Sequence, residues 1–520
     1  MRPAAVLRLP LAGLIVLAVL APLLGLGIDG AAFASLAERA PALGRYGVNT
    51  LLLAASAAGL AALLGTACAW LIERCRFAGR DICAFALFLP FALPPYLAAF
   101  IWSDLADRIG IGFALRNPLG AALIMALALY PYVYFLVRPA FSQQTGALSA
   151  AARTLGCTPW QAFCKVSLPL ARPAIAIGAL LVAMETANDI AVAEDYGLAT
   201  LGYFVYDSWL NRGERAAAAA AAILLALLAL AASWSETVSR IRQRHHQSQL
   251  RTFASEKIAK LSGGKALAAA GVCWLPVLLG FAIPVLALIR HALLAPAVAW
   301  QRLPAGLLGT ALLIAGAAAL AYLLAAAFAF VRSRSRVPGL FEMLARSGYA
   351  IPGSVFALGC LGAAAAAASI LKAITGVSLY WLWVVAPVVL IYALAVRYLA
   401  VAAGALEAGV AALSPGLDKT ARSCGLSRWQ RLRMVHLPLM APALAAGLLL
   451  IATDIAKELP LTLILRPFGM TTLAVEAYGF AADEDLLGAA PPALALVALA
   501  AAGLIVVHRH FRAGNRISAG

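Results

Sequence analysis

The chain contains one pattern twice, as ALSAAARTLGCTPWQAFCKVSLPLARPAI at residues 147–175 and as ALSPGLDKTARSCGLSRWQRLRMVHLPLMAPAL at residues 412–444. From Ala152 and Ala421 onward the two copies align without a gap. The shared positions are Arg153 and Arg422, Gly156 and Gly425, Trp160 and Trp429, Gln161 and Gln430, Leu168 and Leu437, and Pro169 and Pro438. A glycine permits backbone conformations that other residues resist, so each copy is predicted to form two short helices at an angle.

The composition around these two loops is that of a membrane protein. Hydrophobic residues make up 63% of the 520 positions, and charged residues make up only 12%. A soluble globular protein has roughly 45–50% apolar and about 25% charged residues. This difference excludes a soluble enzyme, a disordered chain and a disulfide scaffold, and it predicts an all-α membrane protein.

The hydropathy pattern predicts about twelve transmembrane helices, since about 20 mostly apolar residues are needed to cross the hydrocarbon core. The twelve stretches lie near residues 9–28, 48–72, 82–102, 119–138, 173–193, 216–234, 267–289, 307–331, 347–368, 380–403, 439–465 and 486–507. The first stretch has a basic start, but no cleavage motif clearly follows it. We therefore expect it to be retained as a helix and not removed as a signal peptide.

The charges are distributed unequally between the two sides of these spans. The termini and every second loop hold 28 basic and 7 acidic residues, whereas the opposite loops and span ends hold 11 basic and 16 acidic residues, and Arg397 lies inside a span. Basic residues are enriched in cytoplasmic loops. The pattern predicts that both termini are cytoplasmic. It also accounts for the net charge of +17 without a nucleic-acid partner.

The repeat divides the chain into two halves of six spans, with the repeated loop between the fourth and fifth span of each half. Because six is even, both loops face the cytoplasm and the halves are parallel repeats. The predicted divisions are an N-terminal helix with an outer loop (1–47), a first repeat domain (48–234) with its loop at 147–169, and a cytoplasmic linker (235–266). They continue with a seventh helix and outer loop (267–306), a second repeat domain (307–508) with its loop at 412–438, and a basic tail (509–520).

The repeated loop resembles the EAA signature of ABC-importer permeases, EAA-x3-G-x9-I-x-LP. The first copy places Gly156, Val166, Leu168 and Pro169 on the motif, and the second places Gly425, Val435, Leu437 and Pro438 there. Both copies lack the leading Glu, which is replaced by Ala150 and by Lys419.

The resemblance implies a type I ABC-importer permease with two fused six-helix halves. The two loops would then dock onto two cytoplasmic ABC ATPase subunits. A periplasmic or lipid-anchored substrate-binding protein would deliver the cargo. The expected coupling residues are Ala152, Arg153, Gly156, Trp160, Leu168 and Pro169 in the first loop, and Ala421, Arg422, Gly425, Trp429, Leu437 and Pro438 in the second.

The chain has no sequence that could bind a nucleotide in the usual way. A GxxxxGK[ST] loop, which cradles phosphates, is absent, and the Gly264-Lys265 pair is followed by Ala266. We therefore expect a transport subunit that is not an enzyme and has no cofactor of its own. ATP and Mg²⁺ would be bound by the partner ATPase.

Charged residues at membrane depth are costly and therefore informative. Glu185 and Asp189 lie at the end of the fifth span, and Asp454, Lys457 and Glu458 lie in the equivalent part of the second half. Glu185 and Asp454 are equivalent when the loops are aligned. Two interpretations remain open: these residues line a shared path for a cation, or they lie in water at the outer span ends with Asp454 paired to Lys457. No metal site is assigned.

The run KELPLTLILRPFGMTTLAVEAY at residues 457–478 resembles the second half of ferric-iron importer permeases. That resemblance implies ferric iron as cargo and the bacterial inner membrane as location. Permeases for thiamine, phosphonate, sulfate, molybdate or polyamines share the architecture and remain alternatives. An ion-driven secondary transporter would explain the spans and the carboxylates at membrane depth, but not the two Gly-broken loops.

Overall fold

A computed structural model describes residues 20–22, 24–26, 30–142, 144, 152, 154–244, 259–332, 351–377, 387–411 and 413–517. In this part of the chain, eight helices are long and apolar enough to cross a membrane, and ten spans result if each of two bent helix pairs counts as one. The expected span at residues 216–234 lies within the helix α14 (Arg215–Arg244). Most of the expected span at residues 9–28 lies outside the described residues.

The first half consists of α3 (Gly30–Glu38), α4 (Ala40–Arg74), α5 (Arg80–Ala86), η1 (Leu89–Ala92), α6 (Pro95–Arg108), α7 (Gly112–Leu115), α8 (Pro118–Ser142), α10 (Pro159–Ala162), η2 (Phe163–Ser167), α11 (Leu168–Asn188), α12 (Ala191–Asp195), α13 (Leu201–Tyr206), η3 (Asp207–Asn211) and α14. The strands β1 (Cys75–Arg76) and β2 (Ala259–Lys260) pair in parallel. This pairing ties the chain that enters the second half to the loop after α4.

The second half consists of α15 (Gly263–Val277), η4 (Leu278–Ala282), α16 (Ile283–Leu293), α17 (Ala297–Arg332), α19 (Gly353–Thr375), α21 (Val388–Arg397), α22 (Leu399–Ala411), α23 (Pro415–Ser423), α24 (Arg428–Arg431), η6 (Leu432–His436), α25 (Leu437–Lys457), α26 (Pro460–Leu465), α27 (Leu473–Ala482) and α28 (Leu486–Ile517). From α10 onward, the order α10, η2, α11, α12, α13 and α14 is repeated as α24, η6, α25, α26, α27 and α28, with η3 as an additional element of the first half.

Four of the predicted spans differ from the helices. The stretch at 82–102 bends by 92° between Ala92 and Pro95, and the stretch at 380–403 bends by 52° at Tyr398. The predicted span 439–465 was too long, because α25 ends at Lys457 and a proline at position 460 disfavours helix at the residue before it. The span predicted at 173–193 ends at Asn188, where Asp189 takes an extended conformation.

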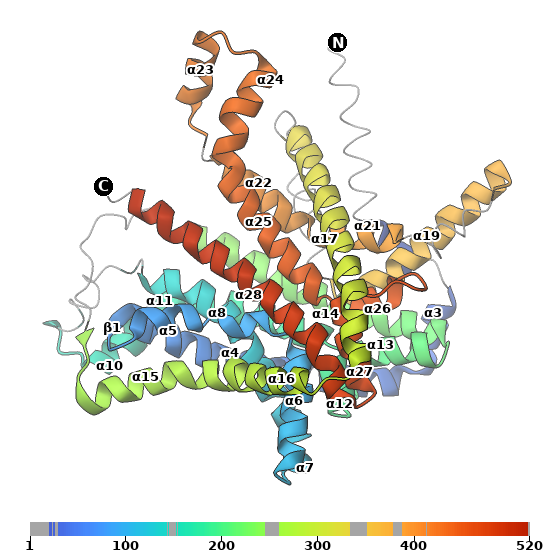
Figure 1. Cartoon of the computed structure of the whole chain (residues 1–520), viewed down its shortest axis with the longest axis horizontal. Helices are drawn as coiled ribbons and strands as arrows, with labels where there is room; N and C mark the ends of the chain where they lie inside the picture. Colours follow the sequence, from blue (N-terminus) through green and yellow to red (C-terminus); the bar gives the residue numbers. More distant parts are fainter. Residues whose placement is uncertain are drawn as a thin grey trace.

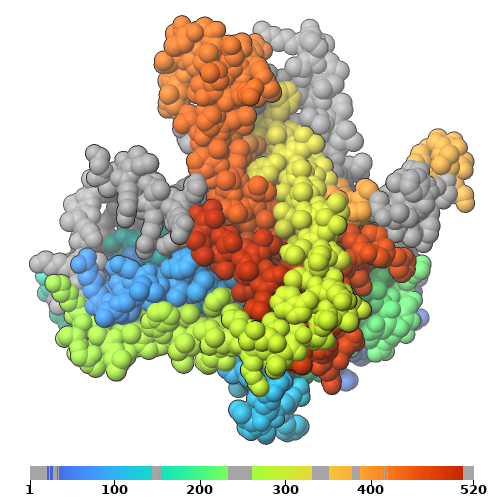
Figure 2. Space-filling view, in the orientation of Figure 1, coloured from blue at the N-terminus to red at the C-terminus, as the bar shows by residue number. Residues whose placement is uncertain are grey.

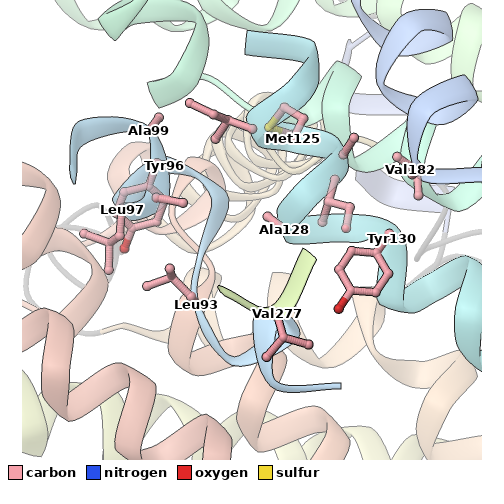
Figure 3. Close-up of a cluster of buried hydrophobic side chains, with 14 of the residues drawn as sticks. Leu93, Tyr96, Leu97, Ala99, Met125, Ala128, Tyr130, Val182 and Val277 are labelled. Carbon is pink, nitrogen blue, oxygen red and sulfur yellow. The ribbon is translucent and has the colours of Figure 1, made fainter. Parts of the chain in front are cut away.

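The two hydrophobic cores do not follow the two halves of the sequence. One core contains α4, α5, α6 and α8 of the first half together with α15, α16, α27 and α28 of the second. Figure 3 shows Val277, from the seventh span, among Leu93, Met125 and Tyr130 of the first half. The other core contains α17, α19, α21 and α22 together with α13 and α14 of the first half. Each half therefore completes its core with helices of the other.

Glycines allow two leading helices to cross onto the opposite half. A Cβ on Gly359 of α19 would lie 1.8 Å from the carbonyl oxygen of Pro22, so only glycine permits this approach. In the seventh span, a Cβ on Gly280 would lie 2.6 Å from the carbonyl oxygen of Leu127 in α8. The described end of the first predicted span, around Pro22 and Gly25, thus packs on the second half, and the seventh span packs on the first half.

The molecule has projecting ends. Figure 1 shows α23 and α24 at the tip of a projecting arm, α7 on the side opposite to α23, and α10 at the edge of the body beside β1. The space-filling view shows the α23–α24 projection at the top and the α7 projection at the bottom (Figure 2). The two repeated loops therefore lie far apart on the molecule.

Candidate functional site

The repeated loop owes its Ala-x3-Gly spacing to the way its first helix ends. In the second copy, the N–H of Leu426 donates to the carbonyl of Ala421 at 3.2 Å, and the N–H of Gly425 donates to the carbonyl of Arg422 at 3.0 Å. These two bonds form a Schellman cap, which places Gly425 in the left-handed region with a φ of 75°. In the first copy, the N–H of Cys157 bonds to Ala152 at 3.0 Å and Gly156 has a φ of 86°.

The second short helix of each loop begins with a capping box. Ser427 and Gln430 exchange hydrogen bonds between side chain and backbone, and Thr158 and Gln161 do the same. The glutamine shared by the two copies therefore caps the N-terminus of its own helix and need not contact a partner. The Trp160 and Trp429 side chains, in contrast, are both 68% exposed, so each loop presents an indole outward.

The sequence predicted that this second short helix is separate from the span that follows. In the structure the two form one helix. One helix runs from Trp160 to Asn188 and another from Arg428 to Lys457, 29 and 30 residues long. Each would extend about 45 Å at 1.5 Å per residue. One continuous helix, which we call a rod, thus links each repeated loop to the interior of the molecule.

Both rods contain a π-helical turn at the same place. The turns cover Phe163–Ser167 and Leu432–His436, and each ends two residues before Pro169 or Pro438. A proline has no N–H to donate and its ring clashes with the carbonyl four residues earlier, which widens the turn that precedes it. The Leu-Pro pair of the motif therefore sets the angle between loop and span.

The inner ends of the two rods meet at a cavity of about 90 Å³ between the halves. The five charged residues predicted from the sequence to be near a path all line the cavity. Arg397, which was noted only as a charge inside a span, lines it as well. The lining is completed by apolar and tyrosine side chains. The polar lining residues are Tyr96, Tyr132, Glu185, Asn188, Asp189, Arg397, Tyr398, Asp454, Lys457 and Glu458.

In the second half, each acidic side chain has a basic neighbour. Lys457 Nζ lies 3.1 Å from Asp454 Oδ1, so the local ion pair expected from the sequence is present. A Cβ on Gly353 would lie 2.7 Å from Glu458 Oε1 and 3.3 Å from Arg397 Nη1, so these two side chains converge on one point. Arg397 is only 5% exposed and also donates to the carbonyl of Ile351 at 2.9 Å.

Asp189 and Glu458 occupy equivalent positions and perform the same structural task. The Asp189 carboxylate accepts the N–H of Val192 at 2.7 Å, at the start of α12. The Glu458 carboxylate accepts the N–H groups of Leu461 and Thr462 at 3.2 and 3.1 Å, at the start of α26. Each carboxylate satisfies orphan donors of the short helix that follows the break.

Contacts between the halves surround the cavity. The N–H of Gly353 donates to Asn188 Oδ1 at 2.6 Å, and Lys457 Nζ lies 3.5 Å from the centre of the Phe91 ring. Asn188 and Lys457 are equivalent in the aligned halves, so each rod ends on a residue that contacts the other half. Tyr478 also donates a hydrogen bond to Glu194 across the interface.

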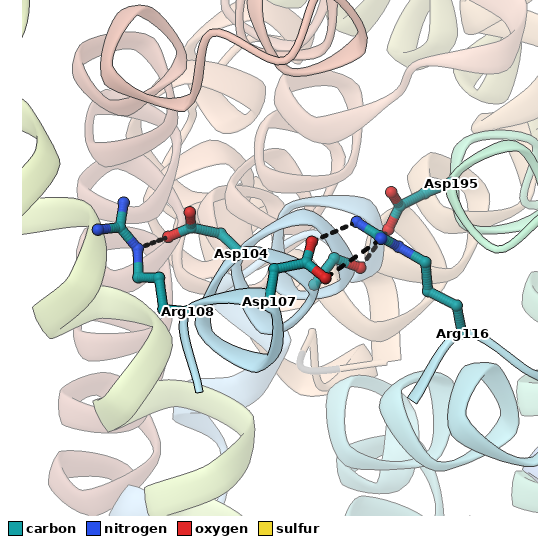
Figure 4. Close-up of polar contacts among 6 residues, drawn as sticks. Asp104, Asp107, Arg108, Arg116 and Asp195 are labelled. Carbon is teal, nitrogen blue, oxygen red and sulfur yellow. Dashed lines mark hydrogen bonds and ion pairs between the residues drawn. The ribbon is translucent and has the colours of Figure 1, made fainter. Parts of the chain in front are cut away.

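A polar layer lies beyond the cavity, at the end of α6. Arg108 pairs with Asp104 at 2.8 Å and Arg116 pairs with Asp107 at 2.7 Å, as Figure 4 shows. Ser103 donates to Asp195 at 2.8 Å, and burial raises the pKa of this carboxyl against the opposing effects of Ser103 and Arg116. These contacts join α6 to α12 on the side away from the repeated loops.

The structure places the site residues in two groups. The loop residues lie in the short helices and at the start of α11 and α25, except Arg153, which falls outside the described residues. The five charged residues lie together at the cavity and not in bulk water. Arg397 and Asn188 were not identified as site residues, although a lone arginine inside a span was a usable signal. Among the described residues, no group of three or more His, Cys, Asp or Glu side chains could hold a metal ion.

Comparison with known proteins gives relatives for both halves. The family of binding-protein-dependent transport system inner membrane components matches residues 61–244 and 317–513. The Fe(3+)-transport system permease protein FbpB 2 of Haemophilus influenzae is 25% identical over 455 residues, which cover 86% of each chain.

Two relatives from Escherichia coli match a shorter segment. The sulfate transport system permease protein CysT is 36% identical over 25% of this chain and 51% of its own length. The molybdenum transport system permease protein ModB is 36% identical over 22% of this chain and 54% of its own length. The family model covers well over half of the present chain, which therefore belongs to the binding-protein-dependent transport system inner membrane components, the permease family of ABC importers, and carries two permease segments in one polypeptide.

Proposed function

We propose that this chain forms the membrane path of an ATP-driven importer of ferric iron. Two ABC ATPase subunits would bind the loops around Gly156 and Gly425 on the cytoplasmic side. A periplasmic or lipid-anchored binding protein would deliver iron to the opposite side. Both termini would be cytoplasmic, and the ATPase subunits would bind the ATP and Mg²⁺.

The observation that carries this proposal is the charged cavity at the inner ends of the two rods. Its four carboxylates and three tyrosine hydroxyls are hard oxygen groups, which suit Fe(III). Its volume of about 90 Å³ would hold a small inorganic ion with a few waters. Thiamine and polyamines are much larger, so this size argues against them. A relative that matches over both halves is itself named for Fe(3+) transport.

The rods explain how the force of ATP binding would reach the cavity. When the ATPase subunits close, they would draw the two loops together. Because each loop is continuous with one rod, the movement would be transmitted to Asn188 and Lys457. The contacts of these residues with Gly353 and Phe91 would then break, and the cavity would open toward the binding protein. ATP hydrolysis would restore the closed contacts.

A sulfate or molybdate importer is the second candidate. The positive charges of Arg397 and Lys457 at the cavity favour it, and so do the relatives named for those anions. The excess of carboxylates over basic groups in the same lining argues against an anion as the cargo.

The test is uptake by the host cell. A strain that lacks this chain should lose uptake of radiolabelled Fe(III) and regain it with a plasmid copy, whereas uptake of sulfate, molybdate and thiamine should be unaffected. Loss of sulfate or molybdate uptake with normal iron uptake would refute the proposed cargo. If ATP depletion left iron uptake intact, the ATP-driven mechanism would be wrong.

A further inference from the structure

The two pseudo-equivalent carboxylates of the cavity have different surroundings. Asp454 Oδ1 is 3.1 Å from Lys457 Nζ. Glu185 lines the same cavity, but the described residues offer its carboxylate no hydrogen bond and no ion pair within 4 Å. The reason lies in the sequence: the position equivalent to Lys457 holds Asn188, which is neutral and accepts the Gly353 N–H.

The imbalance extends to the whole lining. The second half contributes two acidic and two basic side chains, namely Asp454, Glu458, Arg397 and Lys457, which balance each other. The first half contributes Glu185 and Asp189 and no basic side chain. The lining therefore carries a formal excess of two negative charges, both from the first half. Asp189, Asp454 and Glu458 each have at least one carboxylate oxygen bound to a neighbour, whereas both oxygens of Glu185 lack a partner among the described residues.

We propose that Glu185 is the residue that contacts the transported cation and selects it, and that Asp454 serves to neutralise Lys457. This inference rests on the proposed cargo. A path with a single free carboxylate would bind a multivalent cation weakly enough to release it, as conduction requires. The paired side of the cavity would limit the total negative charge and keep the halves together. The two halves of the permease would thus differ in function although their backbones repeat.

The test uses the complete importer in proteoliposomes, with its ATPase and an Fe(III)-loaded binding protein. We expect Glu185→Gln to lower iron uptake about tenfold or more, which corresponds to about 1.4 kcal/mol in the barrier. ATP hydrolysis stimulated by the binding protein should persist, because the loops are untouched. Glu476→Gln is the matched control, since Glu476 lies outside the cavity, 3.9 Å from Arg302, and should transport normally.

Two double variants separate a ligand role from a simple charge effect. Asp454→Asn/Lys457→Gln and Glu185→Gln/Lys457→Gln have the same net charge as the wild type. We expect the first to transport better than Asp454→Asn alone, and the second to remain as impaired as Glu185→Gln. Recovery of uptake in the second double variant would overturn the ligand role of Glu185.

The outcomes also distinguish the inference from the proposed cargo. If the wild-type importer takes up no iron, the cargo is wrong. If the wild type takes up iron and Glu185→Gln does so equally well, only the role of Glu185 is wrong. Should Glu185→Gln fail to reach the membrane, Glu185→Asp keeps the charge and shortens the reach of the carboxylate. Wild-type uptake by Glu185→Asp together with normal uptake by Glu185→Leu would also overturn the inference.

Discussion

Substitution of Gly425 tests whether the repeated loop transmits force. The Cβ of a new side chain would meet no atom within 4 Å, so there is no clash. The cost comes from the backbone, because a φ of 75° lies in the left-handed region. For alanine this cost is about 1–2 kcal/mol, which lowers the population of the correct loop geometry about 5- to 30-fold. The cost is larger for valine, which is β-branched, and smaller for asparagine.

Activity should therefore follow backbone preference and not side-chain size. ATP-dependent uptake is expected to fall in the order Gly425, Gly425→Asn, Gly425→Ala and Gly425→Val, although asparagine is larger than alanine. The same series at Gly156 should give the same order. Uptake in inverted or reconstituted vesicles measures the effect, and immunodetection of the chain in the membrane shows whether insertion is intact.

The control is Gly404→Ala in α22. This glycine also has open space around its Cβ, but it lies within the helix and has no positive φ. Alanine there should be neutral or stabilising by about 1 kcal/mol. If Gly425→Val transports like the wild type, or if alanine is better tolerated than asparagine, the assignment of the loop as the coupling element is refuted.

Three further predictions concern packing and the halves' interface. Gly359→Leu should lower the melting temperature of the detergent-solubilised chain, because even its Cβ would lie 1.8 Å from the Pro22 carbonyl oxygen. Overpacking of this kind costs about 1–3 kcal/mol or more. An unchanged melting temperature would contradict the glycine contact. Pro169→Ala should convert the π turn to α-helix and rotate α10 by about 100° relative to α11. Spin-label distances from the loop to α8 would detect this rotation, and identical distances would speak against it. Tyr478→Phe removes the hydrogen bond to Glu194 between the halves, at a cost of about 1–3 kcal/mol. If this bond holds the halves in the resting arrangement, the variant should hydrolyse more ATP in the absence of binding protein. Hydrolysis at the wild-type rate would show that the bond does not restrain the halves.

The sequence predicted the loop well because the loop is local. Its Gly and its Leu-Pro pair act within 20 positions of one another, so one short stretch of sequence was enough to predict a break between two helices. The capping boxes and the continuity of the second helix with the span were not predicted. Ten of the twelve predicted spans were also found in the described residues when each bent pair counts as one, since hydropathy reports directly on membrane burial. Span ends were less certain, because Leu459 and Pro460 interrupt a run that is apolar throughout.

The cavity could be predicted only in part. Its charged residues were recognised because carboxylates at membrane depth are rare, but the sequence could not decide whether they lie in water or face each other. That depends on α6, α8, α11, α21 and α25 meeting at one point, and hydropathy does not say which span lies beside which. The same limit explains why the exchange of leading helices between the halves was not foreseen.

That exchange has a consequence for how the protein is made. The surface on which Pro22 and Gly25 pack belongs to α19, and the surface for the seventh span belongs to α8 and its neighbours. A half synthesised alone would expose the surface that normally contacts the other half's leading helix, and its own leading helix would have no surface to pack on. Joining the halves in one polypeptide gives each a high effective concentration of the other. It also fixes their ratio at one to one, so the cell is spared the orphan halves that separate genes would produce whenever their translation fell out of balance.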